Sequence, residues 1–419
     1  MRFAPSVNQT MNTASSSATS ASIKNQIIAM LLRKLLGSVA LLVVCAACTT
    51  APPVKPTVAP PSRALLRPVP FAEIPGWSDD MLAEAWPAFA SGCARLVAEP
   101  ATEAIWREPC NAAAAIDRPD KLAARTFFER HFTAYRALDP EGSDTGIATG
   151  YYEPLLNGSR TRSERYRFPL YAPPDDLLTI DLAGLYPELG DKRLRGRVEG
   201  KRVIPYWPRS DIEAGRAPLA GKELVFVDDA IEAFFLQIQG SGRVRLAEGG
   251  VMRIGYADQN GQPFRSIGRI LIERGELSPD AASMQAIKQW ARRHPSELRA
   301  LLDENPSYVF FRERTPDATA AVDGPLGTLG VPLAAGRAVA VDPRSIPLGA
   351  PVFIATTWPL SDRPLNRLVL AQDTGGAIRG PLRLDFFWGF GEEAASQAGR
   401  MKQPVRLWLL WPKDALPPS

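Results

Sequence analysis

The stretch GRAVAVDPRSIPLGAPVFIAT, residues 336–356, indicates the fold class, because short apolar runs alternate in it with turns rich in Gly and Pro. The same texture continues in RLVLAQDTGG (367–376), RLDFFWGFG (383–391) and QPVRLWLLWP (403–412). Short apolar runs bounded by turn residues are typical of β-strands, and many of them in succession favour a barrel or a sandwich. The C-terminal part of the chain is therefore predicted to be built mainly from strands.

Helical patterns lie outside this β-rich part. Residues 79–98 and 118–137 carry apolar residues at helical spacing, which predicts two helices near the N-terminal side of the folded chain. A short helix is expected over 266–275. Ser278 followed by Pro279 is typical of a helix start, so a further helix is expected to begin there.

The middle of the chain, from about residue 146 to about residue 262, is predicted to form short strands and turns. The clearest segments are KELVFVDD (222–229) and IEAFFLQIQGSGRVRL (231–246). This reading places a second β-rich region between the N-terminal helices and the C-terminal strands.

Two aspartates twelve residues apart, Asp373 and Asp385, are the strongest candidates for chemistry. Asp373 opens a Gly-rich turn, whereas Asp385 lies on a predicted strand among apolar and aromatic residues. A carboxyl group with apolar neighbours resists ionisation and can serve as a general acid. Arg383 shares a strand face with Asp385 and would favour its ionised form, so the net effect stays open. In the structural alternative, Asp373 caps a turn and Asp385 is a satisfied strand-end carboxylate.

The N-terminal segment predicts the compartment. Residues 1–29 show no apolar period, and translation is expected to begin at Met30. Arg33 and Lys34 precede a short apolar core that is too short to span a bilayer. Small residues then lead to Cys48, which completes the layout of a secretory signal.

The ending CAAC, residues 45–48, resembles a bacterial lipobox, and this resemblance implies that Cys48 is acylated. Because Thr49 follows, and not Asp, the resemblance to bacterial lipoproteins implies an outer-membrane lipoprotein that faces the periplasm. A plain cleaved signal is the alternative. The Pro-rich residues 49–65 are predicted to form an extended tether.

Composition restricts the class of function. About 350 residues follow the tether, which is enough for two domains. The formal net charge is only +4, with 49 basic and 45 acidic residues and no concentrated basic run, which argues against nucleic-acid binding. The two histidines, His131 and His294, lie in helical patterns and do not suggest a metal site, and no nucleotide-binding motif is present. Cys93 and Cys110 can pair in an oxidising periplasm.

Several separated motifs point to one family. GRAVAVDP and IPLG, within residues 336–349, look like the start of a 3D domain, which is named for three aspartates: here Asp342, Asp373 and Asp385. The chain also resembles membrane-bound lytic murein transglycosylase A in TGYYEP (149–154), QIQGSG (237–242), NPSY (305–308), GEEA (391–394) and AGRM (398–401). The resemblance covers roughly residues 80–415 in order.

This resemblance implies a mainly β fold: a double-psi β-barrel with N-terminal helices and a second, smaller β-rich domain inserted into it. A substrate groove would separate the two. The barrel would comprise residues 66–155 and 301–419, and the inserted domain residues 156–300.

The resemblance also implies an activity without cofactors. Such enzymes cleave the β-1,4 bond between N-acetylmuramic acid and N-acetylglucosamine, and the muramyl 6-hydroxyl attacks C1 to leave a 1,6-anhydro end. Asp385 matches the single catalytic acid, Asp373 the aspartate that supports it and Thr149 a groove residue beside them. Because the attack is intramolecular, no second carboxylate is needed to activate water.

The expected partners are glycan strands of peptidoglycan and, through Cys48, lipid of the outer membrane; murein synthases are left open. Backbone amides at Gly375 and Gly376 could approach a sugar closely, and the role of Glu153 is left open because this family position can carry a small hydroxyl residue. The aromatic residues could be sugar platforms or core residues. The residues expected to contact glycan are Thr149, Tyr151, Tyr152, Glu153, Gln239, Ser241, Gly375, Gly376 and Trp388.

Two other classes of function compete with this reading. A non-catalytic peptidoglycan-binding lipoprotein could use the same barrel, although the intact pair Asp373 and Asp385 argues against it. An aspartic protease would use two Asp-Thr-Gly triplets, which occur here at 144–146 and 373–375. The first triplet follows a loop-like run and not the apolar strand that such a motif needs.

Overall fold

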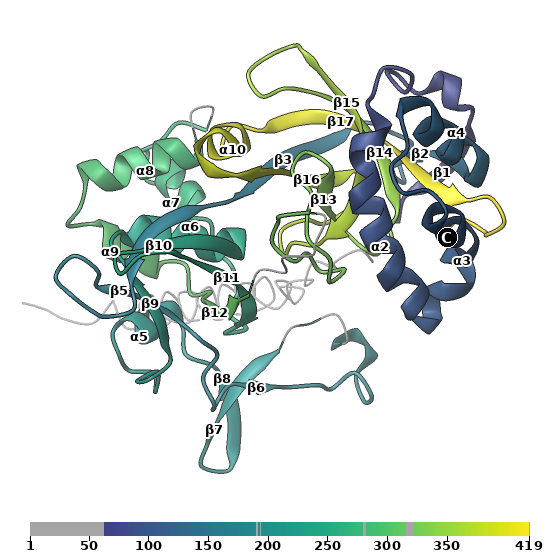
Figure 1. The fold of residues 1–419 in the computed structure, drawn as a ribbon. Coiled ribbons are helices and arrows are strands. Elements are labelled where there is room, and N and C mark those ends of the chain that lie inside the picture. The colour runs from purple at the N-terminus through teal and green to yellow at the C-terminus, as the bar shows by residue number, and fades with distance from the viewer. Residues whose placement is uncertain (1–62, 190–191, 193, 280–281, 316–321, 419) are drawn as a thin grey trace, which may run out of the picture. The chain divides into compact units, whose positions relative to one another are not determined.

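The computed structural model describes residues 63–189, 192, 194–279, 282–315 and 322–418 (Figure 1). The predicted signal segment with Cys48 and most of the tether lie outside the described residues. The described chain is mixed α/β, with more strand than helix, helices near its N-terminal side and several sheets, which confirms the predicted fold class in this coarser form. None of its described helices is long and apolar enough to cross a membrane.

The larger sheet is built from the two ends of the described chain. Its strands are, in spatial order, β1 (Leu65–Val69), β2 (Phe132–Leu138), β17 (Lys402–Pro412), β14 (Pro351–Thr357), β15 (Pro364–Asp373), β13 (Ala338–Val341), β16 (Arg383–Phe390) and β3 (Gly146–Glu153). Because β17 also pairs with β3, the strands from β17 to β3 form a closed ring. Closure pairs the strand edges that an open sheet would expose.

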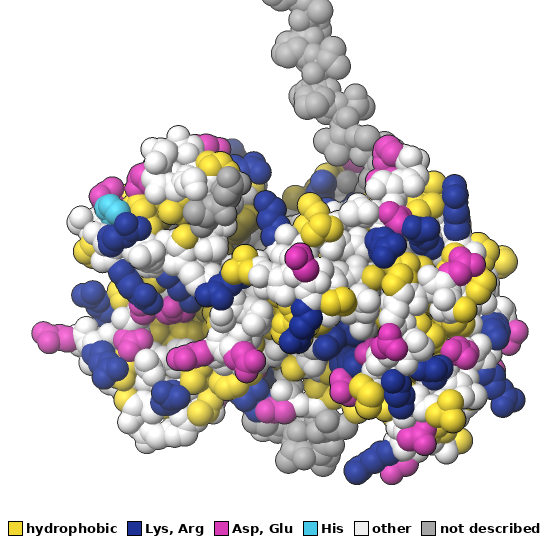
Figure 2. All heavy atoms as spheres, turned by 90° about the horizontal axis from the view of Figure 1, so that it is seen from above, with side chains coloured by type: hydrophobic (Ala, Val, Ile, Leu, Met, Phe, Trp, Pro, Cys, Tyr) yellow, Lys and Arg dark blue, Asp and Glu magenta, His cyan; other side chains and the backbone are white. Residues whose placement is uncertain are grey.

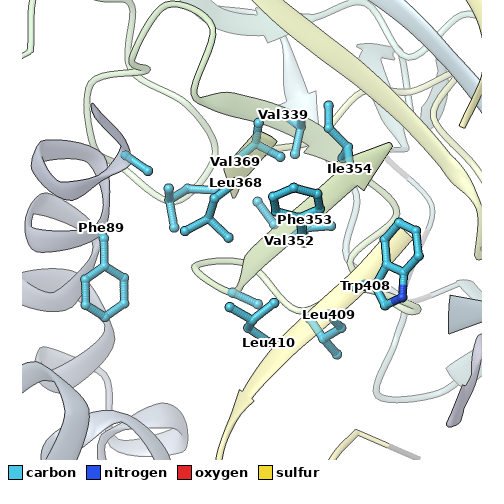
Figure 3. Close-up of a cluster of buried hydrophobic side chains, with 14 of the residues drawn as sticks. Phe89, Val339, Val352, Phe353, Ile354, Leu368, Val369, Trp408, Leu409 and Leu410 are labelled. Atoms are coloured by element: carbon cyan, nitrogen blue, oxygen red, sulfur yellow. The ribbon is translucent and has the colours of Figure 1, made fainter. Parts of the chain in front are cut away.

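The main core lies between this sheet and the N-terminal helices, which are η1 (Phe71–Glu73), η2 (Leu82–Ala85), α2 (Trp86–Ala98), α3 (Pro100–Ala114) and α4 (Lys121–His131). Figure 3 shows Phe89 of α2 in one cluster with apolar side chains of β13, β14, β15 and β17. Each large apolar side chain buried there contributes about 1.5–3 kcal/mol to folding. The core therefore fixes the backbones of the strands that carry Asp373 and Asp385.

Two further links tie the helices together and to the sheet. Arg337, directly before β13, donates two hydrogen bonds to the carboxylate of Asp80, at 2.8 and 2.9 Å, and both side chains are buried. It also donates to Glu84 at 2.8 Å. Cys93 of α2 and Cys110 of α3 are joined by a disulfide.

The chain between the two ends forms a separate sheet with its own helices. The six strands are, in order, β12 (Val309–Arg314), β11 (Val251–Gln259), β10 (Ser241–Leu246), β4 (Leu155–Ser159), β9 (Glu223–Val227) and β5 (Phe168–Tyr171). The helices of this part are α5 (Arg209–Glu213), α6 (Ala230–Gln239), α7 (Ile267–Glu273), α8 (Met284–Arg293) and α9 (Leu298–Asp303). The domain boundaries at 156 and 300 stay a prediction.

A few remaining elements complete the described chain. They are the small sheet of β6 (Leu178–Thr179), β7 (Arg195–Glu199) and β8 (Arg202–Pro205), the short η3 (Pro187–Leu189), and α10 (Gly391–Ala398), which follows β16 directly.

The predicted strand over residues 231–246 is wrong in its first half, because residues 230–239 form α6. Asp229 caps this helix by accepting hydrogen bonds from the amides of Ile231 and Glu232. Gly240 ends it with φ +80°, a conformation that glycine adopts without strain. The dense apolar run is thus a buried helix, and only the second half is a strand, β10.

Two helix boundaries also differ from the prediction. The helix predicted over 118–137 ends at His131, because the next residues pair with β1 and β17 as β2. Helix α8 starts at Met284, and its cap is Ser283, whose hydroxyl accepts a hydrogen bond from the amide of Ala286, and not Ser278. In the first case strand pairing outweighs the helical pattern, and in the second a closer cap takes the place of the predicted one.

Candidate active site

Four residues lie in register across adjacent strands of the larger sheet. Ala340 of β13 is paired with Asp373 of β15 on one side and with Asp385 of β16 on the other. Asp385 is paired in turn with Thr149 of β3. Neighbouring strands are about 4.8 Å apart, so the Cα atoms of the two aspartates are separated by roughly 10 Å. The small side chain of Ala340 lies between them.

The carboxyl group of Asp385 is held by a short chain of hydrogen bonds. The hydroxyl of Thr149 donates to Asp385 Oδ1 at 2.6 Å. The guanidinium of Arg383 donates to the hydroxyl oxygen of Thr149 at 2.7 Å and so orients that hydroxyl toward the carboxyl group. Arg383 is itself fixed by the backbone carbonyls of Leu384 and Ile147.

Burial decides the protonation of Asp385. It raises the pKa of the Asp385 carboxyl from 3.8 to about 6, although the hydrogen bond from Thr149 and the charge of Arg383 lower it, and Asp373 raises it slightly more. The sequence left open whether burial or Arg383 has the larger effect, and in the structure burial does. A carboxyl group with this pKa carries its proton in a useful fraction of molecules near neutral pH.

Asp373 is held by donors from β3 and from the turn that contains Thr328. Its Oδ1 accepts from the backbone amide and the hydroxyl of Thr328, at 3.0 and 2.9 Å, and its Oδ2 accepts from the Tyr151 hydroxyl at 3.1 Å. Burial raises the pKa of Asp373, and these hydrogen bonds oppose the shift. Both oxygens are therefore engaged with protein groups.

The predicted aromatic residues do not gather around Asp385 as exposed platforms. Tyr151 is buried against Phe387, with ring centroids 5.1 Å apart, and directs its hydroxyl to Asp373. Tyr152 is buried against α10. Trp388 alternates with Asp385 and Phe387 along β16, so it lies on the opposite face, where it packs against Trp358 and Phe386.

Three other predicted residues lie at the end of β3, the end of α6 and the start of β10. Glu153 at the end of β3 is buried and accepts from Arg243 at 2.8 Å. Gln239, the last residue of α6, accepts from the backbone amide of Tyr152 at 3.1 Å. Ser241 begins β10 opposite Gly255. None of these three side chains has a hydrogen bond to Asp385 or Asp373 among the described residues.

The Gly-rich turn after Asp373 is shaped by its own contacts. A Cβ at Gly375 would lie 2.8 Å from Ile378 Cγ1, whereas one at Gly376 would meet nothing within 4 Å. Asp342, the first aspartate of the motif, accepts from the amide of Gly380 and from Arg344 and so fixes the far end of this turn. Burial raises the pKa of Asp342, but these hydrogen bonds together have the larger effect, so the pKa lies below its usual value.

Sequence reasoning missed Thr328 and Ala340. Thr328 precedes Asp373 by 45 residues, and nothing near it in sequence indicates that it would reach a carboxylate. Ala340 reads only as one apolar residue of a strand. Its place between the two aspartates follows from strand pairing, which the sequence did not reveal.

Family models match both parts of the chain that build this site. A model described as the MltA specific insert domain matches residues 147–312, and a model described as the 3D domain matches residues 337–411. Thr149 falls in the first match, and Asp373 and Asp385 in the second.

Similar proteins are named for one activity. "Membrane-bound lytic murein transglycosylase A" of Escherichia coli K12 is 33% identical over 270 residues, which cover 62% of this chain and 64% of that protein. The chain thus matches less than two thirds of the length of this curated relative. The crystal structure of MltA from Neisseria gonorrhoeae is 38% identical with a TM-score of 0.73, and the match covers 85% of this chain and 97% of that one.

Two further solved structures add detail. The lytic transglycosylase LtgG of Burkholderia pseudomallei is 48% identical with a TM-score of 0.56, over 84% of this chain and 98% of that one. E. coli MltA has been solved with bound chitohexaose; it is 25% identical with a TM-score of 0.59, over 84% of this chain and 95% of that one.

Proposed function

Because this chain belongs to the membrane-bound lytic murein transglycosylase A family, we propose that it cleaves peptidoglycan without water. The bond broken is the β-1,4 bond between N-acetylmuramic acid and N-acetylglucosamine, and the product is a 1,6-anhydromuramyl end. The observation that carries the proposal is Asp385, a carboxyl group with a pKa of about 6 that is oriented by Thr149.

Asp385 performs both proton transfers of the reaction. Its protonated carboxyl gives a proton to the glycosidic oxygen, and the bond from that oxygen to C1 breaks. The resulting carboxylate accepts the proton of the muramyl 6-hydroxyl while that oxygen forms a bond to C1. Asp385 then carries its proton again, and no water is consumed.

The hydrogen bonds that Asp373 accepts support an intramolecular attack and not hydrolysis. An inverting hydrolase needs a second carboxylate free to activate water on the opposite face of the sugar. Both carboxylate oxygens of Asp373 accept hydrogen bonds from Tyr151 or Thr328. Asp373 therefore acts through its charge, which raises the pKa of Asp385, and not as a base for water.

The closed ring of β17, β14, β15, β13, β16 and β3 supports a double-psi β-barrel, and the six-stranded sheet supports an inserted second domain that helps to hold the glycan. The relatives' name and the lipobox-like sequence support anchoring through Cys48 in the outer membrane, with the enzyme facing the periplasm.

The test uses a soluble form that begins after Cys48, with purified murein sacculi as substrate and mass spectrometry of the products. We expect fragments with 1,6-anhydromuramyl ends, which are absent with Asp385→Asn. Reducing ends would show hydrolysis and contradict the proposed chemistry. Sacculi that bind the protein but release nothing would favour a binding protein, and retained activity in Asp385→Asn would remove Asp385 from its role.

A further inference from the structure

A row of arginines crosses the six-stranded sheet in register. Arg243 of β10 is paired with Arg253 of β11, which is paired with Arg314 of β12. Residues two apart on a strand share a face, so Arg245 and Arg312 extend this row on the same side. We call these five residues the arginine face.

Carboxylates neutralise this arginine face only in part. Arg243 pairs with Glu153 and Asp323, and Arg253 pairs with Asp323. Arg245, Arg312 and Arg314 form no ion pair within the described ranges of the chain, and the charge of Glu153 acts on Arg314 only without such a contact. On the face of the molecule that Figure 2 shows, basic and acidic side chains are interspersed. Like charges directly opposite one another destabilise a sheet. The row of arginines therefore does not serve the stability of the fold.

A glycine on the neighbouring strand makes room for the side chain of Arg314 in this row. A Cβ at Gly255 would lie 2.7 Å from Arg314 Cδ, so the absence of a side chain there lets the stem of Arg314 lie across β11. Burial lowers the pKa of Arg314, and the charges of Arg312 and Arg253 lower it further, although Glu153 opposes them. The sheet thus holds cations close together that repel one another.

Two cavities open on the arginine face. One, of about 430 Å³, is lined by Arg243, Arg245 and Arg253 together with Leu155, Val251 and Phe390. The other, of about 410 Å³, includes Arg253, Arg312 and Arg314. The guanidinium of Arg243 lies 4.0 Å from the centroid of the Phe390 ring, which is 42% exposed. The site therefore offers both cations and apolar surface.

The arginine face is linked to the strand that carries Thr149, because Arg243 pairs with Glu153 at the end of β3. Glu153, the partner of Arg243, is four residues further along β3, which is about 13 Å at the usual rise of a strand. A glycan strand cleaved at Asp385 could therefore reach the arginine face with groups attached to a nearby sugar.

We propose that the arginine face binds the free carboxylates of the peptides carried by muramyl residues. The inference rests on the proposed function and deepens it, because it names the peptide-bearing strand as the preferred substrate. Guanidinium groups bind carboxylates through paired hydrogen bonds, and the apolar residues Leu155, Val251 and Phe390 suit the peptide stem.

The test compares Arg245→Gln/Arg312→Gln with the wild type and with Arg292→Gln, a matched change of an exposed arginine on α8. The substrates are peptide-bearing glycan strands and the same strands after an amidase has removed the peptides. We expect the preference for peptide-bearing strands, as a ratio of kcat/KM values, to fall about tenfold in the double variant, since hydrogen bonds to charged groups are lost. Arg292→Gln should keep the wild-type ratio.

Binding to the Asp385→Asn protein gives a second readout that needs no turnover. With the two arginine changes added, its Kd for peptide-bearing strands should rise about tenfold and approach that for peptide-free strands. An unchanged ratio, or equal losses on both substrates, would overturn the inference and leave the proposed function standing. Loss of binding to anionic phospholipid vesicles with an unchanged ratio would assign the arginine face to lipid. A wild type that yields no anhydro products would defeat the proposed function, while the Kd comparison would still decide the inference.

Discussion

At the scale of the residue, the proposed catalytic carboxyl group of Asp385 destabilises the folded protein. The pKa of Asp385 is about 6 in the folded protein and 3.8 in its ordinary state. Between these values the folded protein binds the proton more tightly than the unfolded chain. Stability therefore falls as pH rises through this window, by about 3 kcal/mol in all, and the loss is complete above pH 6.

We expect Asp385→Asn to abolish cleavage and to stabilise the protein at pH 8, because a neutral side chain replaces a buried charge. The gain should be about 1–3 kcal/mol at pH 8 and should vanish near pH 4, where the wild-type carboxyl is protonated. Urea unfolding at both pH values measures it. A variant that is less stable than the wild type at pH 8 would contradict the assigned pKa.

Thr149 and Arg383 should set the pH range of activity. Both lower the pKa of Asp385, so Thr149→Val and Arg383→Gln should raise it and move the alkaline limb of the kcat/KM profile to higher pH. Thr328→Val is the control, because it removes a hydrogen bond to Asp373 and should not move this limb upward. Variants that lose activity equally at every pH would point to a purely structural role.

At the scale of the element, β3 approaches β16 and α10 so closely that its glycines matter. A Cβ at Gly150 would lie 2.6 Å from Trp388 Nε1 and 2.9 Å from the Cα of Ala398. Gly150→Ala should therefore destabilise the protein by about 1–3 kcal/mol, as overpacking usually does. Gly376→Ala, in open space, is the control, and chemical unfolding compares them. Equal stabilities would mean that β3 and α10 can separate at little cost.

The buried ion pair between Arg337 and Asp80 fixes the N-terminal helices beside β13. Asp80→Ala should cost about 3–5 kcal/mol, because it leaves the buried guanidinium of Arg337 without its main partner. Glu84→Ala removes a contact of the same arginine on a side chain that is 59% exposed, so its effect should stay below about 1 kcal/mol. Thermal unfolding separates the two, and similar losses would show that Asp80 is not the dominant partner.

The elements show what the sequence could predict. The strands from residue 336 onward followed from their apolar runs and turns, and the motifs identified Asp373 and Asp385. Helix α6 was missed, because a buried helix and a buried strand both read as a dense apolar run. Ala340 could not be found because strand pairing places it between the two aspartates. Thr328 could not be found because it reaches Asp373 from a turn 45 residues away in sequence.

At the scale of the whole molecule, the disulfide between Cys93 and Cys110 restrains a helical hairpin that covers the larger sheet. The two cysteines are 17 residues apart, and closing a loop of that size stabilises a fold by about 3 kcal/mol. Reduction, or the change of both residues to Ala, should lower stability by that order, as measured by urea unfolding with and without reductant. No difference would mean that α2 and α3 pack equally well without it.

The pairing of β16 with β3 has a consequence for how activity arises during folding. Thr149 and Asp385 are 236 residues apart in sequence, and the whole six-stranded sheet is formed from the chain between them. Contacts between such distant residues form slowly, since a long loop must close first. A partly synthesised or partly folded chain therefore has no catalytic centre. The proposed lytic activity therefore becomes available only late in folding.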